Sequence, residues 1–578
     1  MRRQYAIRSL TLVAGFALIA VAVIVQMIRI QTSEQAGIFL SQGDRYAGEF
    51  RTFYPERGEI YDRNGHLLAG NRTVYEVGVS LSQMKNPDAL ASTLGTYLEM
   101  TYEEVYKKLT ESPESWEYVV IQDYVDANTV ATLQGLAQQM DDVHDPRLRG
   151  MSFKPHFQRS YPETSLGSNV LGFVTRDGRG YFGIEEKYND LLAGNPVQVW
   201  VPRDPNKATE IPRVPNGTTL VLTLNRDLQA QVESILDQSL IDYGAIYGAI
   251  IVMNPRNGEI LAMATTPRMD LNNYNNYFSL YDDGSQYNRS IGTAYEPGSV
   301  IKVLTMAAAL DAGTVTPETT YVDTGSIQVG GFTIQNWDRD AWGQQDMTGC
   351  LQHSLNVCMA WISTQMGPQT FYGYMERFGL GHPTSVDLAG EAMGRLKVPG
   401  DSDWYNIDLG TNAFGQGVTA TPLQLMMAAS AVANDGKMVT PHMLYSMLRD
   451  GHQYNVPSQY GGSPITLQTA HTLNEMLASS LEAESSSALL PGYRVAGKTG
   501  TAQIPTDFGY DDERTNASFI GWGPVDDPQF MVYIWLSQPT SSIWGSQTAA
   551  PVFSKVAQET VIQLNLPPDN VRSQLASK

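Results

Sequence analysis

A long segment without any charge lies near the N-terminus, and it limits what this chain can fold into. Residues 9–28, SLTLVAGFALIAVAVIVQMI, span about 20 residues, enough for one helix to cross a bilayer. A cleavable signal peptide has a shorter apolar region that ends in small residues, whereas the apolar character here extends to Ile30. The sequence therefore favours an uncleaved transmembrane anchor over residues 9–30.

The charges in front of this segment predict its orientation. Arg2, Arg3 and Arg8 precede it, and positive residues are retained on the cytoplasmic side of a membrane. Residues 1–8 are therefore expected to form a short cytoplasmic tail. Because no later segment is comparably long and apolar, the rest of this single-pass chain is expected to lie outside the cytoplasmic membrane.

The composition of the 578-residue chain excludes several classes of protein. Hydrophobic residues make up 42% and charged residues 17%, which is typical of a folded protein, and the length requires two or more domains. The formal net charge is −21 and Lys and Arg do not cluster, so nucleic-acid binding is not expected. The eight histidines lack metal-ligand spacing and no P-loop occurs, so neither a metal nor a cofactor is expected.

Residues 31–215 are expected to form a strand-rich domain outside the membrane. Two short extended segments flank the turn DRNG, and a helical insertion is expected over about 86–150, where helices follow Asn or Asp caps. A stretch rich in Pro, Asn and Gly at 201–219 predicts a linker.

Residues 216–578 are expected to form a second domain of the α+β class. A helix at 225–244 and a β-hairpin at 248–267 begin it, and three strand-like segments lie near its end: YRVAGKTGTAQI, ASFIGWGPVD and QFMVYIWLS. Strands at both ends that enclose helices predict an antiparallel sheet covered by helices, with a helical subdomain between.

Two cysteines occur, Cys350 and Cys358, so the chain does not depend on a disulfide framework. A single bridge between them is one alternative. If both lie on one continuous helix, however, eight residues separate them by about 12 Å, which is too far for a bond. We therefore favour two free thiols.

A core-type helix in the second domain carries an unusual polar stripe. The segment SVIKVLTMAAAL from Ser299 is apolar almost all round, yet Ser299, Lys302 and Thr305 recur every three residues and share one face. A serine hydroxyl needs a base to become a nucleophile, and burial lowers the pKa of a lysine enough to serve. A helix-capping serine with a snorkelling lysine is the alternative for this S-x-x-K motif alone.

Two further motifs strengthen the catalytic interpretation. Ser354 and Asn356 form an S-x-N, and Lys498, Thr499 and Gly500 form a K-T-G on a strand-like segment. S-x-x-K, S-x-N and K-T-G in this order are typical of the penicillin-interacting serine acyl enzymes.

Other segments narrow the resemblance to one family. NRSIGTAYEPGS before the nucleophile, PERGEIYDRNGHLLAGN, GYFGIEEKYNDLLAG, FGQGVTATPLQL and SFIGWGPVDDP resemble class B penicillin-binding proteins, the monofunctional peptidoglycan D,D-transpeptidases. The resemblance runs from the anchor almost to the C-terminus. It implies a pedestal domain of the dimerisation type followed by a β-lactamase-like transpeptidase domain, in a bacterial cell-wall enzyme that β-lactams acylate.

The resemblance also implies a role for each motif residue. Ser299 would attack the carbonyl between two D-alanines of a stem peptide, and Lys302 would accept its proton. Ser354 would relay a proton to the leaving D-alanine, and Asn356 would hold the substrate amide and Lys302.

The K-T-G strand would hold the donor stem peptide, the one that acylates Ser299. Lys498 would add positive field and bind the terminal carboxylate with Thr499 and Thr501, and the backbone N–H groups of Ser299 and Thr501 would form the oxyanion hole. An amine from a neighbouring stem would then attack the acyl-enzyme. The pedestal would dock a membrane glycosyltransferase of the SEDS family.

Several rival functions share these motifs. A class A β-lactamase needs a glutamate for deacylation, and no E-x-x-L-N follows Ser354. A D,D-carboxypeptidase, which uses water as the acceptor, and a catalytically weak scaffold or β-lactam sensor remain alternatives. A bifunctional enzyme would need a glycan-polymerising motif, and residues 45–215 show none.

The sequence leaves open whether the chain acts in cell division or in cell elongation. Glu296 in YEPGS is typical of division enzymes and LAGNRTVYEV is typical of elongation enzymes.

Overall fold

The computed structural model describes residues 2–32, 48–113, 115–202, 214–281, 285–506 and 509–576. The chain divides into two compact units, Met1–Glu56 with Gly194–Asn216 and Arg57–Ala193 with Gly217–Lys578. Part of the linker expected at 201–219 falls on residues 203–213, which lie outside the described residues, as does 33–47 of the expected first domain.

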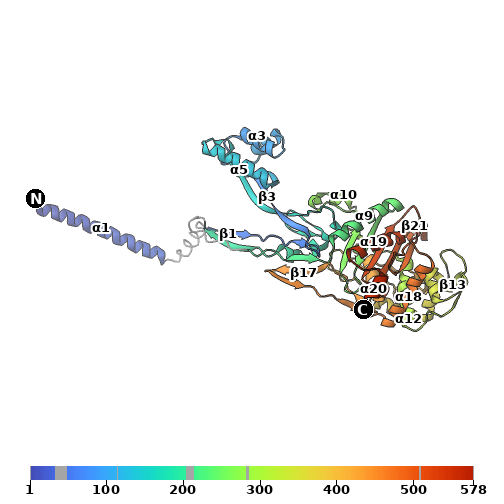
Figure 1. Ribbon diagram of the computed structural model, residues 1–578. Coiled ribbons are helices and arrows are strands. Elements are labelled where there is room, and N and C mark those ends of the chain that lie inside the picture. The colour runs from blue at the N-terminus through green and yellow to red at the C-terminus, as the bar shows by residue number, and fades with distance from the viewer. Residues whose placement is uncertain are drawn as a thin grey trace. The chain divides into compact units, whose positions relative to one another are not determined.

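The first unit contains the predicted anchor as one helix. Helix α1 (Arg2–Gln31) includes the tail arginines, and its apolar part, Leu10–Gln31, has a mean hydropathy of 2.5 and no buried residues (Figure 1). By length and composition this helix can cross a membrane. The same unit holds strands β1 (Gly48–Phe53) and β8 (Val197–Pro202), which pair antiparallel.

The centre of the second unit is a five-stranded antiparallel sheet of order β11-β10-β22-β21-β20. The predicted hairpin and the three late strands supply it: β10 (Tyr247–Met253), β11 (Ile260–Thr265), β20 (Ala496–Thr506), β21 (Gly509–Gly523) and β22 (Phe530–Ser537). Ile250 and Val252 of β10 pack into one core and Ile251 and Met253 into another. Because both faces are buried, β10, β11 and β22 are apolar along nearly their whole length rather than alternating.

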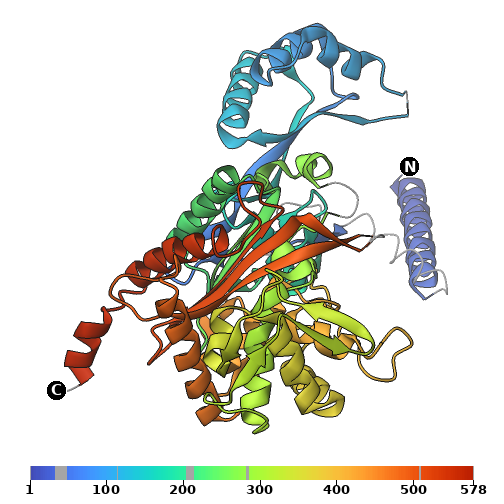
Figure 2. The ribbon, with the colours of Figure 1, turned by 90° about the vertical axis from the view of Figure 1, so that its right-hand side faces the viewer.

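Helices cover both faces of this sheet (Figure 2). Helices α9 (Arg226–Tyr243) and α19 (Ala549–Gln563) pack on one face. The other face carries α12 (Lys302–Asp311), α17 (Pro422–Ala433) and α18 (Leu467–Ala483). The predicted mixed α+β fold, with an antiparallel sheet under helices, is confirmed.

A helical subdomain lies between the early and late strands, as predicted. Its helices are α13 (Met347–Gln352), α14 (Asn356–Met366), α15 (Pro368–Arg377) and α16 (Asp408–Thr411). Two small ribbons, β12 (Tyr321–Asp323) with β15 (Gly343–Gln345) and β13 (Ser326–Val329) with β14 (Phe332–Gln335), precede them.

The pedestal contributes a second, mixed sheet of order β18-β17-β9-β2-β3-β4, in which β5 also pairs with β3. Its strands are β2 (Ile60–Tyr61), β3 (Leu67–Ser80), β4 (Tyr118–Asp126), β5 (Met151–Ser160), β9 (Thr219–Leu222), β17 (Leu444–Arg449) and β18 (His452–Asn455). Strand β2 pairs in parallel with β9. The sheet therefore joins strands from both sides of residue 216.

Helices follow the predicted Asn and Asp caps in the expected insertion, and strand β4 lies between them. Asn86 caps α3 (Pro87–Tyr97), Thr101 caps α4 (Tyr102–Thr110) and Asp126 caps α5 (Ala127–Asp142), each through its side chain. Strand β3 leads out to these helices (Figure 1).

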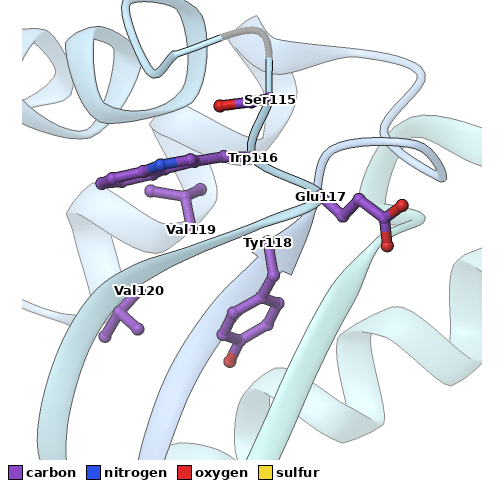
Figure 3. A pocket seen from close by; sticks show the side chains of 6 residues that line it. All are labelled: Ser115, Trp116, Glu117, Tyr118, Val119 and Val120. Atoms are coloured by element: carbon purple, nitrogen blue, oxygen red, sulfur yellow. The ribbon is translucent and has the colours of Figure 1, made fainter.

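The edge of β4 bears a shallow hollow lined by residues 115–120. Trp116 is 53% exposed, and Figure 3 shows its indole beside Val119 while Tyr118 and Glu117 point elsewhere. The hollow is built from one strand edge, and its lining contains none of the predicted site residues. The predicted site residues therefore lie elsewhere in the described part of the chain.

A buried ion-pair cluster fixes the base of the pedestal. Both carboxylate oxygens of Glu185 accept a hydrogen bond at 2.7 Å, one from Arg57 Nε and one from Arg159 Nε. Tyr161 donates its hydroxyl to the same carboxylate. Glu185 belongs to α7 (Gly183–Lys187), so this helix, β5 and the segment before β2 are tied together.

Candidate active site

Ser299 lies on a short 3₁₀ turn, η4 (Gly298–Ile301), that leads directly into α12. Gly298 has a φ of 57°, and a Cβ added there would lie 2.9 Å from the carbonyl oxygen of Thr501. Only glycine permits both this left-handed backbone and such an approach. The turn therefore brings Ser299 against strand β20, which carries the K-T-G motif.

Lys302 is fully buried and connects the first two motifs. Its Nζ lies 2.6 Å from the carbonyl oxygen of Ser354, 2.8 Å from Asn356 Oδ1 and 3.2 Å from Ser354 Oγ. Burial, and then the charge of Lys498, hold the pKa of Lys302 well below its ordinary value. A neutral amine has two N–H donors for the two carbonyl-type oxygens, which leaves its lone pair for a hydroxyl proton.

A sharp turn at Ser354 gives the S-x-N motif its shape. Helix α13 ends at Gln352 and α14 begins at Asn356, and Ser354 between them has a φ of 53°. The two helices are joined by a disulfide between Cys350 and Cys358, whose Cα atoms are 6.1 Å apart. The prediction of two free thiols is wrong, because the left-handed turn breaks the continuous helix on which it depended.

Replacing both cysteines by alanine is expected to lower the free energy of unfolding by about 2–3 kcal/mol, because the bridge closes a short loop in the unfolded chain. Urea denaturation of the oxidised chain measures this loss. A reductant should destabilise the natural chain and leave the double variant unchanged. Equal unfolding midpoints for the natural chain with and without reductant would contradict the expectation.

Lys498 lies on β20, at the edge of the sheet, and is 5% exposed. Burial lowers the pKa of Lys498 to about 8, while Glu484 opposes the shift. Its Nζ is 3.2 Å from Thr499 Oγ1.

Gly500 lets strand β20 approach the Ser299 turn closely. A Cβ on Gly500 would lie 2.2 Å from Ser518 Oγ and 2.8 Å from Val300, so glycine allows β20 to pack against this turn. In the described part of the chain β20 is the last strand of this sheet, and an extended peptide can add to such an edge strand.

A cavity of about 220 Å³ connects the K-T-G strand with the S-x-N helices. Lys498 and Thr499 line one side and Gln352 of α13 another. Glu484 lines it too, and burial raises the pKa of its carboxyl while Lys498 lowers it. Of the predicted site residues the cavity lining includes Lys498 and Thr499. The contacts of Lys302 and of the glycines in the Ser299 turn and β20 bring the whole predicted set to this region: Ser299, Lys302, Ser354, Asn356, Lys498, Thr499, Gly500 and Thr501.

Sequence reasoning missed three side chains at this site. Glu484 lies beside Lys498, and Trp337 and Trp544 contact each other with ring centroids 5.0 Å apart. None of the three belongs to a spacing motif, so only the tertiary structure identifies them.

A buried amine beside serine hydroxyls, under a helix-covered antiparallel sheet, defines the class of serine acyl-transfer enzymes that react with penicillin. The family model described as the penicillin-binding protein transpeptidase domain matches residues 248–558, and the penicillin-binding protein dimerisation domain matches residues 52–210. The chain therefore belongs to the penicillin-binding protein transpeptidases. The predictions of a class B member and of a serine D-Ala-D-Ala transpeptidase are confirmed.

Individual relatives agree with this family. Stage V sporulation protein D of Bacillus subtilis is 32% identical, over 89% of this chain and 79% of the relative. The probable peptidoglycan D,D-transpeptidase PbpC of Pseudomonas aeruginosa is 28% identical over 99% and 97%. The structure of penicillin-binding protein 3 of Mycobacterium tuberculosis complexed with aztreonam is 25% identical, with a TM-score of 0.67 over 90% and 98% of the two chains.

Proposed function

We propose that this protein cross-links peptidoglycan stem peptides through an acyl-enzyme on Ser299. The observation that carries the proposal is the buried Lys302 amine, held by Ser354 and Asn356 one turn beyond Ser299. The name of the Pseudomonas aeruginosa relative supports the same reaction.

Each step of acylation would use one of the predicted residues. Ser299 Oγ attacks the carbonyl between two D-alanines while Lys302 Nζ accepts its proton, and the backbone N–H groups of Ser299 and Thr501 stabilise the oxyanion. Ser354 lies within hydrogen-bond distance of Lys302 and returns the proton to the leaving D-alanine. Asn356 holds Lys302 and the substrate amide.

The donor peptide binds along the outer edge of β20. Its backbone adds to the strand, and its terminal carboxylate meets Lys498, Thr499 and Thr501 while Gly500 keeps the strand close to Ser299. A β-lactam places its ring carbonyl at the same position and leaves a stable ester on Ser299. The aztreonam complex of the Mycobacterium tuberculosis relative supports this acylation.

A fluorescent penicillin tests the proposal directly. The folded chain should acquire one covalent adduct, and mass spectrometry of the digest should place it on the peptide that contains Ser299. The heat-denatured chain is the control and should acquire none. An adduct elsewhere, or none at all, would favour the alternative of a catalytically weak scaffold.

The membrane placement belongs to the same proposal. Residues 1–8 lie in the cytoplasm, 9–30 cross the membrane, and the pedestal (31–215) and transpeptidase domain (216–578) lie outside it. Helix α1 exposes its apolar side chains along its length, and together with the pedestal it would contact a SEDS-family glycosyltransferase. Affinity purification from membranes, followed by mass spectrometry, should recover such a polymerase with the full chain and not with a chain that starts at residue 48.

A further inference from the structure

Two tryptophans from different parts of the transpeptidase domain meet edge to face. Trp337 lies in the helical subdomain, between β14 and β15. Trp544 lies in the loop between β22, a strand of the five-stranded sheet, and α19, a helix that covers it. Their ring centroids are 5.0 Å apart and the ring planes are inclined by 67°. The pair therefore links two elements that share no strand pairing.

Each tryptophan is fixed to one wall of the candidate site. Trp337 Nε1 donates to the carbonyl of His353, directly before Ser354, at 3.2 Å. On the other wall, the N–H of Gly545 donates to Thr501 Oγ1 at 3.0 Å. A Cβ on Gly545 would lie 2.2 Å from the carbonyl of Gly500, so the loop of Trp544 is pressed against the K-T-G strand.

These contacts join the two walls that carry the S-x-N and K-T-G motifs. They run from His353, directly before Ser354, through Trp337 and Trp544 to Gly545 and Thr501. Trp337 is 49% exposed, so solvent reaches the pair where it bridges the two walls. Two indoles at that place form an apolar cover.

We propose that Trp337 and Trp544 form a movable aromatic cover that keeps water from the acyl-enzyme and so directs it to an amine acceptor. The inference rests on the proposed function. A stem peptide that brings the amine gains binding energy along the cleft and can part the rings, whereas a single water molecule cannot. The strength of one edge-to-face pair corresponds to roughly a two- to ten-fold preference for the closed arrangement.

Both competing reactions start from the same ester. In transfer, the amine lone pair forms an amide with the acyl carbon, the bond to Ser299 Oγ breaks with its electron pair on oxygen, and the amine proton passes through Lys302 to that oxygen. In hydrolysis, water replaces the amine and the product is a carboxylic acid. The cover therefore changes the ratio of the two products and not the acylation that precedes them.

The test uses the full chain in detergent with a D-alanyl thioester as donor and a stem peptide that carries a free side-chain amine as the acceptor. The measured quantity is the ratio of transfer product to hydrolysis product. We expect Trp337→Ala and Trp544→Ala each to lower this ratio by roughly two- to ten-fold. The double variant should lower it no further, because either single change already opens the cover.

Matched variants separate the cover from a loss of packing. Trp544→Phe keeps an aromatic edge and should retain the natural ratio, and Trp116→Ala removes an exposed indole from the pedestal and should leave the ratio unchanged. An unchanged ratio in both alanine variants, with melting temperatures like that of the natural chain, would overturn the cover. Failure of the natural chain to form an acyl-enzyme would instead overturn the proposed function.

Discussion

Replacing Lys302 by methionine will slow acylation by a fluorescent penicillin by about 10²–10⁴-fold, the usual range for loss of a general base. Methionine fills a similar volume without an amine, so the buried site keeps its packing and loses only the proton acceptor. The measurement is the second-order rate of adduct formation, with melting temperature as the check on folding.

The neighbouring polar residue on the same helix gives the matched control. Thr305 is fully buried one turn further on, and its hydroxyl donates to the carbonyl of Ala413 at 2.8 Å. Thr305→Val should cost about 1 kcal/mol of unfolding free energy and leave the acylation rate within two-fold. Equal losses of rate in both variants would mean that the polar stripe is structural and that Lys302 is not the base.

The pH dependence of the acylation rate of the natural chain tests the same role of Lys302 as the base. Because burial and Lys498 lower the pKa of Lys302, its neutral form is already abundant well below pH 10.5, and the acylation rate should rise as pH increases through that lowered pKa. Lys498 has a pKa of about 8, so its positive charge, and with it carboxylate binding, should fade above that pH. The expected profile is a bell whose alkaline limb lies near pH 8.

The sequence predicted which residues would form the site and could not show how they meet. The order of S-x-x-K, S-x-N and K-T-G predicts the catalytic groups, and the Asn86 and Asp126 caps predict where helices begin, because both depend on residues close in sequence. The parallel pairing of Ile60 with Leu220 depends on a register that no local pattern records.

The disulfide illustrates the limit most clearly. The spacing of Cys350 and Cys358 excludes a bond on a straight helix, and the bond exists because Ser354 adopts a left-handed conformation that few non-glycine residues take. The contact between Trp337 and Trp544 could not be predicted from the sequence for a related reason. Each indole is placed by a loop, and the contact depends on both loops. Loop geometry is decided by tertiary packing rather than by periodicity.

The pedestal offers the other large expected effect. Glu185→Gln will lower the free energy of unfolding by about 3–5 kcal/mol, because it leaves the buried Arg57 and Arg159 without their shared counter-ion. Urea denaturation followed by the fluorescence of the nine tryptophans measures the change. Adduct formation at Ser299 should persist at low urea, since Glu185 lies on α7 and takes no part in the predicted site.

An exposed glutamate provides the control for this variant. Glu111 is 65% exposed and pairs with Lys107 at 3.7 Å, and Glu111→Gln should cost less than about 0.5 kcal/mol because water screens such a pair. If the two variants unfold at the same urea concentration at pH 7, the buried cluster does not hold the pedestal together.

The ion pairs of Glu185 also make stability depend on pH. Burial raises the pKa of Glu185, but Arg159 and Arg57 outweigh the effect of burial and hold this pKa below its usual value. The stabilisation by Glu185 is therefore present above the unfolded pKa of 4.5 and is lost as pH falls through the lower folded value.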